Sequence, residues 1–266
     1  MKNNLPNIDS PYQIDSNKIN FFWNNGYVIL KNVLSRDEIK IYRQEIKKAA
    51  DKRMKKKDKS FDGAFKQALN LRFDSKGVEK FCLSKRLGKI AADLMKVNAV
   101  RIFHEQAIFK HPGDTKSYWH QDQFFWPLDT NLHIGMWMPL IDCTKDMGLM
   151  KFVIGSHEHG TLNGISISDQ SETYYNKIIK KNNMKIFEVA NLNAGDCTFH
   201  FNNTIHGAGI NISKKIREAM VVTYYADGSR LRKLDKLLQD VSNIYLGGKK
   251  EGELADHKMN KIVYQH

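Results

Sequence analysis

The segment Ser117–Thr130, which reads SYWHQDQFFWPLDT, places a histidine and an aspartate two residues apart among five aromatic rings. In an extended strand, side chains at positions i and i+2 project to the same face, so we expect His120 and Asp122 to converge. A neutral imidazole and a carboxylate are costly to bury together unless a positive group lies between them. The spacing therefore predicts a metal ion at this point, with further ligands elsewhere in the chain.

Among the ten histidines, His206 is the strongest candidate for the third ligand. It lies in FNNTIHGAGIN, at the end of a strand-like run, where Gly207 and Gly209 allow the backbone to approach closely. A rival pair, His157 and His159, follows a glycine turn in GSHEHG, but a histidine in a loop more often bonds the backbone. The single histidines elsewhere are interpreted as core or surface groups: His104, His111, His133, His200 and His257.

An arginine stands eleven residues after His206, at the start of an otherwise apolar run. If the Arg217 guanidinium points inward there, it is a buried charge without a partner until an anion binds to it. A carboxylate is the fitting anion, because its two oxygens match the planar guanidinium. We therefore expect Arg217 to bind a carboxylate.

Two histidines and one aspartate form the facial triad that holds nonhaem iron(II) and leaves coordination positions open. A 2-oxo acid can chelate the iron through two of these positions, and O₂ can take the third. A His-x-Asp pair alone is a weak signal. Combined with a distant histidine and an arginine in a strand-rich half, it predicts an iron oxygenase whose co-substrate is a dicarboxylic 2-oxo acid.

The segments that must position these residues are short, strand-like and separated by Gly, Asp, Asn and Thr turns. They begin at Ala99 and read AVRIFHEQAIFK, HIGMWMPLID, LMKFVIGSH, MKIFEVANL, DCTFHF and REAMVVTYYA. Many short strands with turn residues between them indicate a sandwich or barrel. Inward-facing side chains from several strands converge in such a barrel.

Helices are predicted to precede this strand-rich half. A strand is expected over Tyr27–Leu34, and Ser35 with Glu38 forms a capping-box pattern that starts a helix. A second helix starts near Ser84. The predicted fold class is α+β, mainly β: a jelly roll, cupin-like, with supporting N-terminal helices. No linker divides the chain, so we expect one domain over residues 1–266: a helical part at about 10–97, a core at about 98–230 and an extension at 231–266.

Several segments resemble the phytanoyl-CoA dioxygenase family of iron(II)/2-oxoglutarate-dependent oxygenases. The resemblance runs from about Phe22 to Gly228 and rests on GYVILKNVLSRDEI, the FK of Phe109-Lys110, WHQD, GMWMPL, GLMKFVIGSH and HGAGIN with its following arginine. It implies a double-stranded β-helix, which is a jelly roll, with iron at its open end.

The resemblance also implies roles for individual residues. Arg217 would bind the distal carboxylate of 2-oxoglutarate, and Gln106 and Trp137 would line its pocket. Two positions depart from the family pattern: Ile154 stands where a proline is usual, and Ala208 where a hydroxyl residue is frequent. The catalytic residues and iron ligands would be His120, Asp122 and His206.

The implied reaction couples oxidative decarboxylation of 2-oxoglutarate to hydroxylation of an organic substrate, with Fe(2+) as cofactor, O₂ as co-substrate, and succinate and CO₂ as products. Related iron halogenases have Ala or Gly in place of the carboxylate ligand, which opens a position for chloride. Because Asp122 is present, hydroxylation is favoured over halogenation. We expect the aromatic residues around the triad to keep the site dry.

The charge and composition of the chain limit which classes of partner are expected. Lys and Arg number 42 against 29 Asp and Glu, and eight basic residues cluster in Lys47–Lys59. The net charge of +13 favours an anionic substrate by steering. No stacking aromatics interleave the basic run, so nucleic acid is not expected as a partner. The chain shows no signal peptide and no long apolar span, and its three cysteines lack C-x-x-C spacing, so we expect a cytoplasmic protein.

Two alternatives to the small-molecule dioxygenase stay open. One is a jelly-roll ligand-binding protein that has lost the reaction. The other is a nucleic-acid-directed dioxygenase, favoured only by the basic run. The sequence leaves the substrate, the position oxidised and the oligomeric state undetermined.

Overall fold

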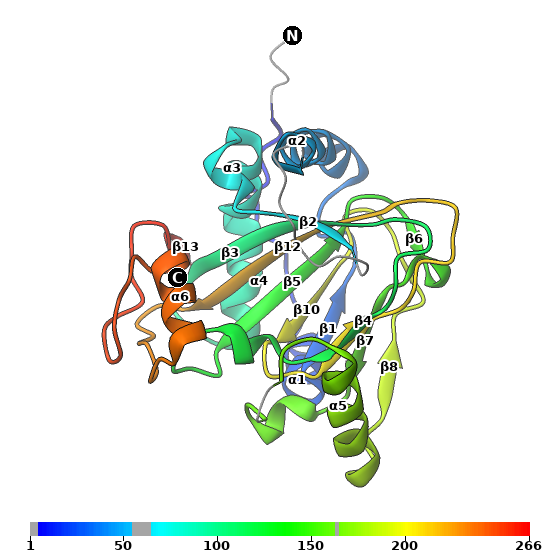
Figure 1. The fold of residues 1–266 in the computed structure, drawn as a ribbon. Helices are drawn as coiled ribbons and strands as arrows, with labels where there is room; N and C mark the ends of the chain where they lie inside the picture. Colours follow the sequence, from blue (N-terminus) through cyan, green and yellow to red (C-terminus); the bar gives the residue numbers. More distant parts are fainter. Residues whose placement is uncertain (1–4, 55–64, 163–164) are drawn as a thin grey trace.

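The strands form two main antiparallel sheets, and helices from the first hundred residues cover one of them (Figure 1). The structure is a computed structural model that describes residues 5–54, 65–162 and 165–266. Its α-helices are α1 (Ser16–Asn25), α2 (Arg36–Met54), α3 (Lys76–Cys82), α4 (Lys85–Met95), α5 (Asp169–Lys181) and α6 (Lys236–Tyr245).

The larger sheet carries the two longest strands side by side at its centre. Its order is β1 (Tyr27–Leu30), β10 (Cys197–Phe201), β5 (His133–Pro139), β12 (Arg217–Ala226), β3 (Ala99–Lys110) and β13 (Ile262–Gln265), with β2 (Lys66–Leu69) also paired to β3. The bounds of β3 and β12 coincide with two predicted runs, whose β-branched and aromatic residues suit a buried strand. Their register places Arg217 opposite Lys110.

The smaller sheet packs face to face against the larger one. Its order is β4 (Ser117–His120), β11 (His206–Ala208), β7 (Met150–Val153) and β8 (Ile186–Glu188); β6 (Cys143–Thr144) and β9 (Asn191–Leu192) form a separate short pair. Phe152 and Ala208 from the smaller sheet share one apolar cluster with Trp137 and Ala219 from the larger. The fold is therefore a jelly-roll sandwich with additional helices, which confirms the predicted fold class.

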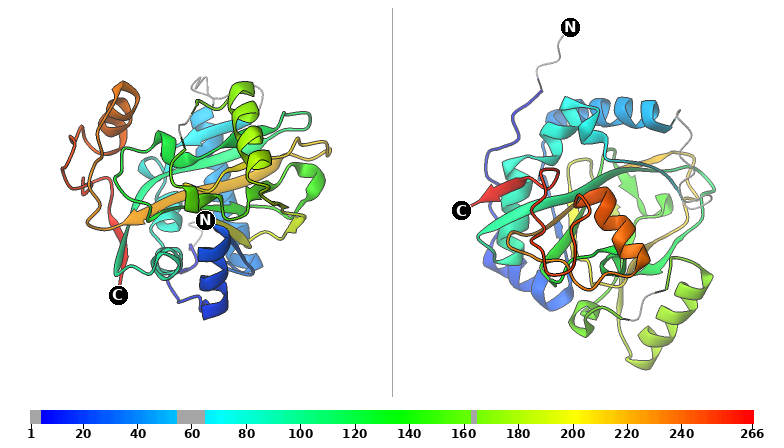
Figure 2. Two further views of the ribbon diagram at one scale, coloured as in Figure 1. Left: turned by 90° about the horizontal axis from the view of Figure 1, so that it is seen from below. Right: turned by 60° about the vertical axis from the view of Figure 1, so that its left-hand side comes forward.

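The outer face of the larger sheet is buried by helices. Phe22 of α1, Ile46 of α2 and Ile90 of α4 belong to the same buried cluster as Val222 of β12 and Phe199 of β10. Helix α4 runs along this face and contacts β3, β5, β12 and β13 (Figures 1 and 2). The helices leave the inner face of the sheet free to build a site.

The predicted helix starts are confirmed in both cases. The Glu38 carboxylate accepts a hydrogen bond from the Ser35 backbone N–H at 2.7 Å, and Ser35 Oγ accepts one from the Glu38 N–H at 3.2 Å. Ser84 Oγ accepts from the Leu87 N–H at 3.4 Å at the start of α4. Each hydroxyl satisfies an amide that the helix itself leaves unpaired.

Two local predictions were wrong in extent. The strand expected over Tyr27–Leu34 ends at Leu30, because Asn32 adopts a left-handed conformation with φ of 52° and donates its N–H to the Asp196 carboxylate at 2.9 Å. The expected order of helices first and strands after is also incomplete, since α5 and α6 lie among and beyond the strands.

The C-terminal extension returns to the larger sheet. Strand β13 pairs with the first residues of β3, and α6 packs near the short 3-10 helix that follows β4. Figure 2 shows α6 and β13 on the same side of the molecule. Residues 231–266 therefore add both an edge strand and a covering helix to the core that precedes them.

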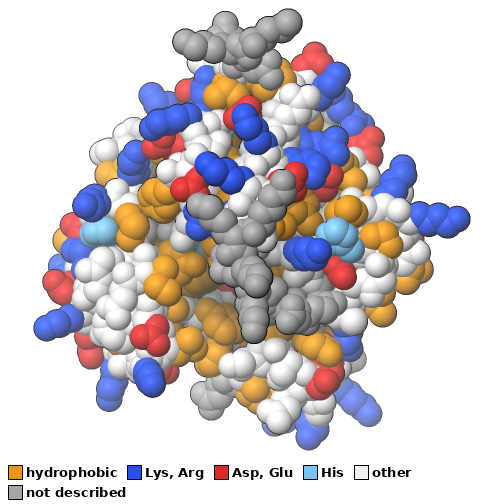
Figure 3. Space-filling model, turned by 45° about the horizontal axis from the view of Figure 1, so that its top comes forward, with side chains coloured by type: hydrophobic (Ala, Val, Ile, Leu, Met, Phe, Trp, Pro, Cys, Tyr) orange, Lys and Arg blue, Asp and Glu red, His pale blue; other side chains and the backbone are white. Residues whose placement is uncertain are grey.

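The predicted basic run lies only partly in the described chain. Residues 47–54 form the end of α2, and residues 55–59 fall outside the described ranges. Lys47 pairs with Asp51 at 3.0 Å, and Arg53 pairs with Asp74 of the segment before α3. Figure 3 shows Lys and Arg side chains interspersed with acidic ones on the face that carries α2. The described part of the run is thus partly neutralised by neighbours.

A buried ion pair ties the residues after β2 to the centre of the larger sheet. The Arg72 guanidinium donates to the Glu105 carboxylate of β3, and the Arg72 N–H donates to the same carboxylate at 2.9 Å. Both side chains are nearly inaccessible to water, with exposures of 4% and 0%. Burial raises the pKa of Glu105, and Arg72 opposes that shift.

Removing one partner of this pair should destabilise the fold strongly. In Arg72→Ala the Glu105 carboxylate stays buried without compensation, a defect that costs about 3–5 kcal/mol. The measurement is the free energy of unfolding from chemical denaturation. Lys76→Ala is the control, because the Lys76–Glu79 pair is exposed and should contribute little. Equal stability of the two variants would contradict the prediction.

Candidate metal centre

Three side chains with metal-ligating atoms meet where two strands of the smaller sheet pair. His120 ends β4, and its partner across the ladder is His206, the first residue of β11. Asp122 begins the 3-10 helix η2 (Asp122–Phe125) directly after β4. One ligand atom of each lies within 4.8 Å of the others, and in the described ranges these residues form the only such group. The structure therefore brings together the three residues that the sequence singled out.

The strand assumed to run from His120 through Asp122 is not continuous, but the two side chains still converge as expected. β4 ends at His120, but Gln121 remains extended with φ of −117° and ψ of 127°, so the side chains on either side of it still share a face. The Gln121 amide is buried, donates to Gly160 O and accepts from the Leu162 N–H, both at 2.9 Å. These bonds hold the turn that carries the carboxylate.

Both histidines have one ring nitrogen occupied and one free. The Nδ1 atoms lie 2.7 Å from Tyr118 O for His120 and 2.9 Å from Thr204 O for His206. A carbonyl only accepts, so each Nδ1 carries the proton and each Nε2 offers a lone pair. The Nε2 atoms lie 3.6 and 3.7 Å from the Asp122 carboxylate oxygens. This donor set fits a divalent metal ion, with backbone carbonyls fixing the ring orientation.

The electrostatics of the three residues also suit a cation. Burial lowers the pKa of both His120 and His206 to about 4, so both rings are neutral at pH 7. Burial alone would raise the pKa of Asp122, but the surrounding histidines more than offset it and hold that pKa below its usual range. A carboxylate charge among neutral nitrogens attracts a positive ion.

A third histidine, His200, lies at this centre, although from the sequence we interpreted it as a core or surface group. His200 of β10 is 2% exposed, its Nε2 is 3.6 Å from the Asp122 carboxylate, and its ring centroid is 4.3 Å from that of His206. Neither of its ring nitrogens has a hydrogen-bond partner among the described residues. The available signal was a polar residue between two phenylalanines in a buried strand.

Two buried cations lie side by side at the other end of the inner face. Arg217 is 2% exposed, donates from Nη1 to Gly148 O, and has no hydrogen-bond partner at Nε in the part of the chain described. Lys110, its ladder partner, donates from Nζ to Thr115 O at 2.8 Å and Gly209 O at 2.7 Å. Within the described residues, neither forms an ion pair.

Burial weakens the charged form of both cations, and the charge of Arg217 further weakens that of Lys110. Burial lowers the pKa of Arg217 to about 10. Burial, and then the charge of Arg217, lower the pKa of Lys110 to about 7. An anion placed between them would relieve both effects. The sequence predicted that Arg217 would require a bound anion. It did not predict the same for Lys110, although the Phe109-Lys110 pair was noted.

The two residues predicted to line the co-substrate pocket lie on neighbouring positions of the larger sheet. Trp137 is 2% exposed, and the Arg217 guanidinium carbon lies 5.4 Å from the centre of its ring. Gln106 and Trp137 both pair with Val221 of β12, from opposite sides. Trp137 is thus in contact with the cation site, and Gln106 lies at the same level of the sheet as Trp137.

The rival histidine pair lies elsewhere. His157 Nε2 bonds Trp23 O at 2.8 Å, and its ring stacks on Phe201 with centroids 5.1 Å apart. His159 is exposed at the end of the short helix that contains both. The position of His157 is explained by its contacts with α1 and β10.

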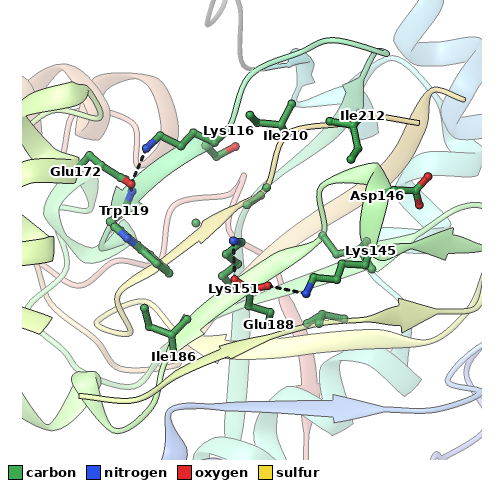
Figure 4. A pocket seen from close by; sticks show the side chains of 16 residues that line it. Lys116, Trp119, Lys145, Asp146, Lys151, Glu172, Ile186, Glu188, Ile210 and Ile212 are labelled. Atoms are coloured by element: carbon green, nitrogen blue, oxygen red, sulfur yellow. Dashed lines mark hydrogen bonds and ion pairs between the residues drawn. The ribbon is translucent and has the colours of Figure 1, made fainter. Parts of the chain in front are cut away.

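A groove of about 750 Å³ is lined by residues of β4, β7, β8, β11 and α5 (Figure 4). Ion pairs form among its lining residues, between Lys116 and Glu172 at 2.7 Å, and from Glu188 to Lys151 at 2.7 Å and to Lys145 at 3.2 Å. None of the three ligand residues lines it. The groove is therefore separate from the metal centre.

Fold and site together define a jelly-roll oxygenase of the kind that uses iron(II) and 2-oxoglutarate. The family model for phytanoyl-CoA dioxygenase matches residues 22–219, and the chain belongs to that family. It is 25% identical over 243 residues to phytanoyl-CoA dioxygenase 1 of Oryza sativa subsp. japonica, covering 76% of this chain and 86% of that one. It is 22% identical over 231 residues to ectoine dioxygenase of Stutzerimonas stutzeri (strain A1501), covering 76% and 74%.

Solved structures share the fold over most of the chain. The α-ketoglutarate-dependent carbocyclase SnoK from nogalamycin biosynthesis superposes with a TM-score of 0.79 at 19% identity, over 95% of this chain and 99% of that one. The epimerase SnoN, described in complex with Fe³⁺, α-ketoglutarate and nogalamycin RO, gives 0.74 at 21% identity, over 93% and 97%. No helix among the described residues is both long and apolar enough to cross a membrane.

Loss of one ligand should abolish tight iron binding. His206→Ala removes one of three donor atoms, and we expect it to lose iron(II) on desalting after anaerobic reconstitution. His157→Ala is the control, since its ring is held by Trp23 and Phe201. The measurement is iron content per folded protein, with folding checked by circular dichroism. Full iron occupancy in His206→Ala together with loss in His157→Ala would show that the triad is misassigned.

Proposed function

We propose that this protein hydroxylates a small organic substrate as an iron(II)- and 2-oxoglutarate-dependent dioxygenase, with release of succinate and CO₂. The observation that carries this proposal is the distribution of charge inside the sandwich. The carboxylate of Asp122 lies among neutral nitrogens, and Arg217 and Lys110 lie together without an acidic partner in the described chain. The first group calls for a cation and the second for an anion.

Packing connects these two groups through a few inner-face side chains. The ring of His200, beside Asp122, lies 5.5 Å from Phe152. Phe152 and Trp137 share one apolar cluster, and Trp137 contacts Arg217. A dicarboxylic 2-oxo acid satisfies both ends, because its oxo-acid end can chelate a metal while its far carboxylate meets the guanidinium. The apolar side chains between them exclude water from the reacting atoms.

The residues of this chain provide ligation and orientation. His120, Asp122 and His206 would hold the metal through two Nε2 atoms and one carboxylate oxygen. When bound, iron(II) with 2-oxoglutarate supplies the oxidising power, through O₂-dependent decarboxylation of the co-substrate to succinate. Trp137 would lie against the co-substrate's far end, and Gln106 would line the same pocket at the level of Val221.

The position of Asp122 favours hydroxylation over halogenation. Its carboxylate lies 3.6–3.7 Å from the Nε2 atoms of both ligand histidines. A halide would need the coordination position that this carboxylate fills. We therefore infer that chloride does not enter the product.

The nucleic-acid alternative gains no support from the described part of the basic run. Lys47 and Arg53 pair with Asp51 and Asp74, so these two charges are partly neutralised. The binding-protein alternative differs from the proposal only in lacking turnover. Succinate release that depends on added 2-oxoglutarate distinguishes the two.

Truncation of the arginine should weaken co-substrate binding without emptying the metal site. Arg217→Ala loses a charge-assisted bidentate pair, which costs about 2–5 kcal/mol, or roughly 30- to 4000-fold in affinity. The measurement is a titration of 2-oxoglutarate into the anaerobic iron(II) protein, following the metal-to-ligand absorption band. Arg217→Lys should recover only part of the affinity, because an ammonium lacks the planar fork.

Arg36→Ala is the matched control, since Arg36 is 59% exposed and pairs with Asp142 on the surface. It should bind 2-oxoglutarate as the wild type does. Unchanged affinity in Arg217→Ala would show that the co-substrate is held elsewhere or is not 2-oxoglutarate.

Co-substrate affinity should fall as the pH rises above 7. The pKa of Lys110 is about 7 without a bound anion, so above that pH binding must take up a proton to form the ammonium. Below pH 7 Lys110 is already charged, so it contributes no pH dependence to the affinity for 2-oxoglutarate. The affinity should fall by up to about tenfold per pH unit above 7. Lys110→Met should bind more weakly at pH 6.5 and lose this slope; an equal slope in both proteins would contradict the assignment.

A further inference from the structure

A cluster of buried polar atoms without partners lies on the far side of Asp122 from the cation site. Its members are His104 of β3, Trp126 after η2 and His133 of β5. His104 Nδ1, Trp126 Nε1 and His133 Nε2 are all buried and lack hydrogen-bond partners among the described residues. The ring centroids are 4.7 Å apart for His104 and Trp126, and 6.0 Å for Trp126 and His133. Such atoms are costly to bury unless something binds to them.

The hydrogen-bonding roles of two of these atoms can be assigned. Gln123 Nε2 donates to Leu128 O at 3.0 Å, which fixes the amide so that its oxygen faces His133 Nδ1 at 3.3 Å. An amide oxygen only accepts, so Nδ1 carries the proton and His133 Nε2 is an acceptor. The indole N–H of Trp126 can only donate. The cluster therefore presents one acceptor and one donor.

The cluster carries no free charge. Burial lowers the pKa of His104 to about 4 and that of His133 to about 3, so both rings are neutral at pH 7. The charged groups that act on His104 are Asp122, a ligand residue of the proposed metal site, and Arg72, which is paired with Glu105. An anionic ligand group would find no free cation here, and a bound metal would neutralise Asp122 towards a cationic one, whereas a hydroxyl can donate to His133 and accept from Trp126.

Further unpaired polar atoms link the cluster to the metal centre. His200, which faces Asp122, has two, and both polar atoms of the Asn202 amide also lack partners in the described chain. Gly135 leaves room beside them, since a Cβ there would lie 3.0 Å from His200 Cε1 and 3.5 Å from Asn202 Oδ1. His133 and Gly135 are two residues apart in β5 and therefore lie on the same face of the strand. The row of polar atoms runs along that face toward the metal-ligand residues.

The cluster is covered by a helix that lies outside the family match. The Tyr245 ring of α6 lies 5.6 Å from His104 and 6.5 Å from Trp126. The match ends at residue 219, and α6 begins at Lys236. The three metal-ligand residues lie within the part of the chain that the family model matches. The helix that covers this cluster lies after the end of that match.

We propose that His104, Trp126 and His133 form the substrate-binding site and that they bind an uncharged, hydroxyl-bearing group of the substrate beside the metal centre. The inference rests on the proposed dioxygenase function, since it assigns the substrate of that same site. The net charge of +13 then contributes through long-range steering and not through contacts at this cluster.

Two variants remove one orphaned atom each. Trp126→Phe keeps an aromatic ring and removes the donor, and His133→Asn keeps a donor for Gln123 and removes the acceptor nitrogen Nε2. Trp23→Phe is the matched control, because its indole donates to Leu94 O at 2.8 Å. Trp126→Phe breaks no bond within the protein, so its melting temperature should fall less than that of Trp23→Phe.

Binding is tested with ring-matched probes on the zinc(II)–2-oxoglutarate protein by saturation-transfer NMR: methyl glucopyranoside, myo-inositol, glucuronate and glucosamine. The two neutral polyols should bind, and each cluster variant should weaken them by about tenfold while Trp23→Phe does not. Binding of only the charged probes, absence of binding by the neutral ones, or equal binding by all variants would overturn the assignment and leave ordered water as the occupant.

The anaerobic 2-oxoglutarate titration separates this inference from the proposed function. If the wild type shows no metal-to-ligand band, the dioxygenase proposal fails, and the substrate assignment fails with it because it rests on that function. If wild type and both cluster variants show the same band while the neutral probes do not bind, only the substrate assignment fails.

Discussion

The pairing of β4 with β11 is the constraint on which the metal centre depends. It places His206 opposite His120 and leaves Asp122 at the turn that follows, so three ligand atoms converge without a dedicated loop. The approach is so close that a Cβ at Gly207 would lie 2.7 Å from Ser117 O. Glycine is thus required next to the distal histidine by the strand pairing itself, which is the physical content of the His-Gly pattern seen in the sequence.

A second close contact between two backbone segments holds the side chains of Arg217 and Lys110 in place. A Cβ at Gly148, where φ is +72°, would lie 2.3 Å from Gly209 O. These two glycines supply the carbonyls that accept from Arg217 and Lys110. The backbone therefore holds both cations in place while leaving their charges uncompensated. At the other end of the inner face, the negative charge of the Asp122 carboxylate has no bound cation beside it. The inner face is therefore complementary to a cation at the Asp122 end and an anion at the Arg217 end.

The sequence predicted the elements whose signals are local. The capping box at Ser35, the helix at Ser84, and strands β3 and β12 follow from side-chain period and hydrogen bonding within a few residues. Contacts between distant segments carried no such signal: Lys110 beside Arg217, and His200 beside Asp122, depend on strand order, which periodicity does not encode. The convergence of His120 and Asp122 was expected from their i, i+2 spacing, and His206 was chosen from its place at a strand end beside glycines. The family resemblance then implied the same three ligands. The roles of Gln106 and Trp137 stay predictions.

The metal-ligand residues and the cover of the polar cluster come from different parts of the chain. The ligand triad and Arg217 lie within residues 22–219, the part shared with the family. The segment beyond it reaches back to the site: Arg232 donates to Trp126 O and Gln123 O, both at 3.0 Å, and so restrains the turn that begins with Asp122. Tyr245 of the same segment covers the polar cluster. Residues 231–266 also pair with β3 through β13, but none of them is a ligand of the metal site. Changes near Arg232 and Tyr245 can therefore alter what lies beside the metal site while leaving the three ligand residues in place.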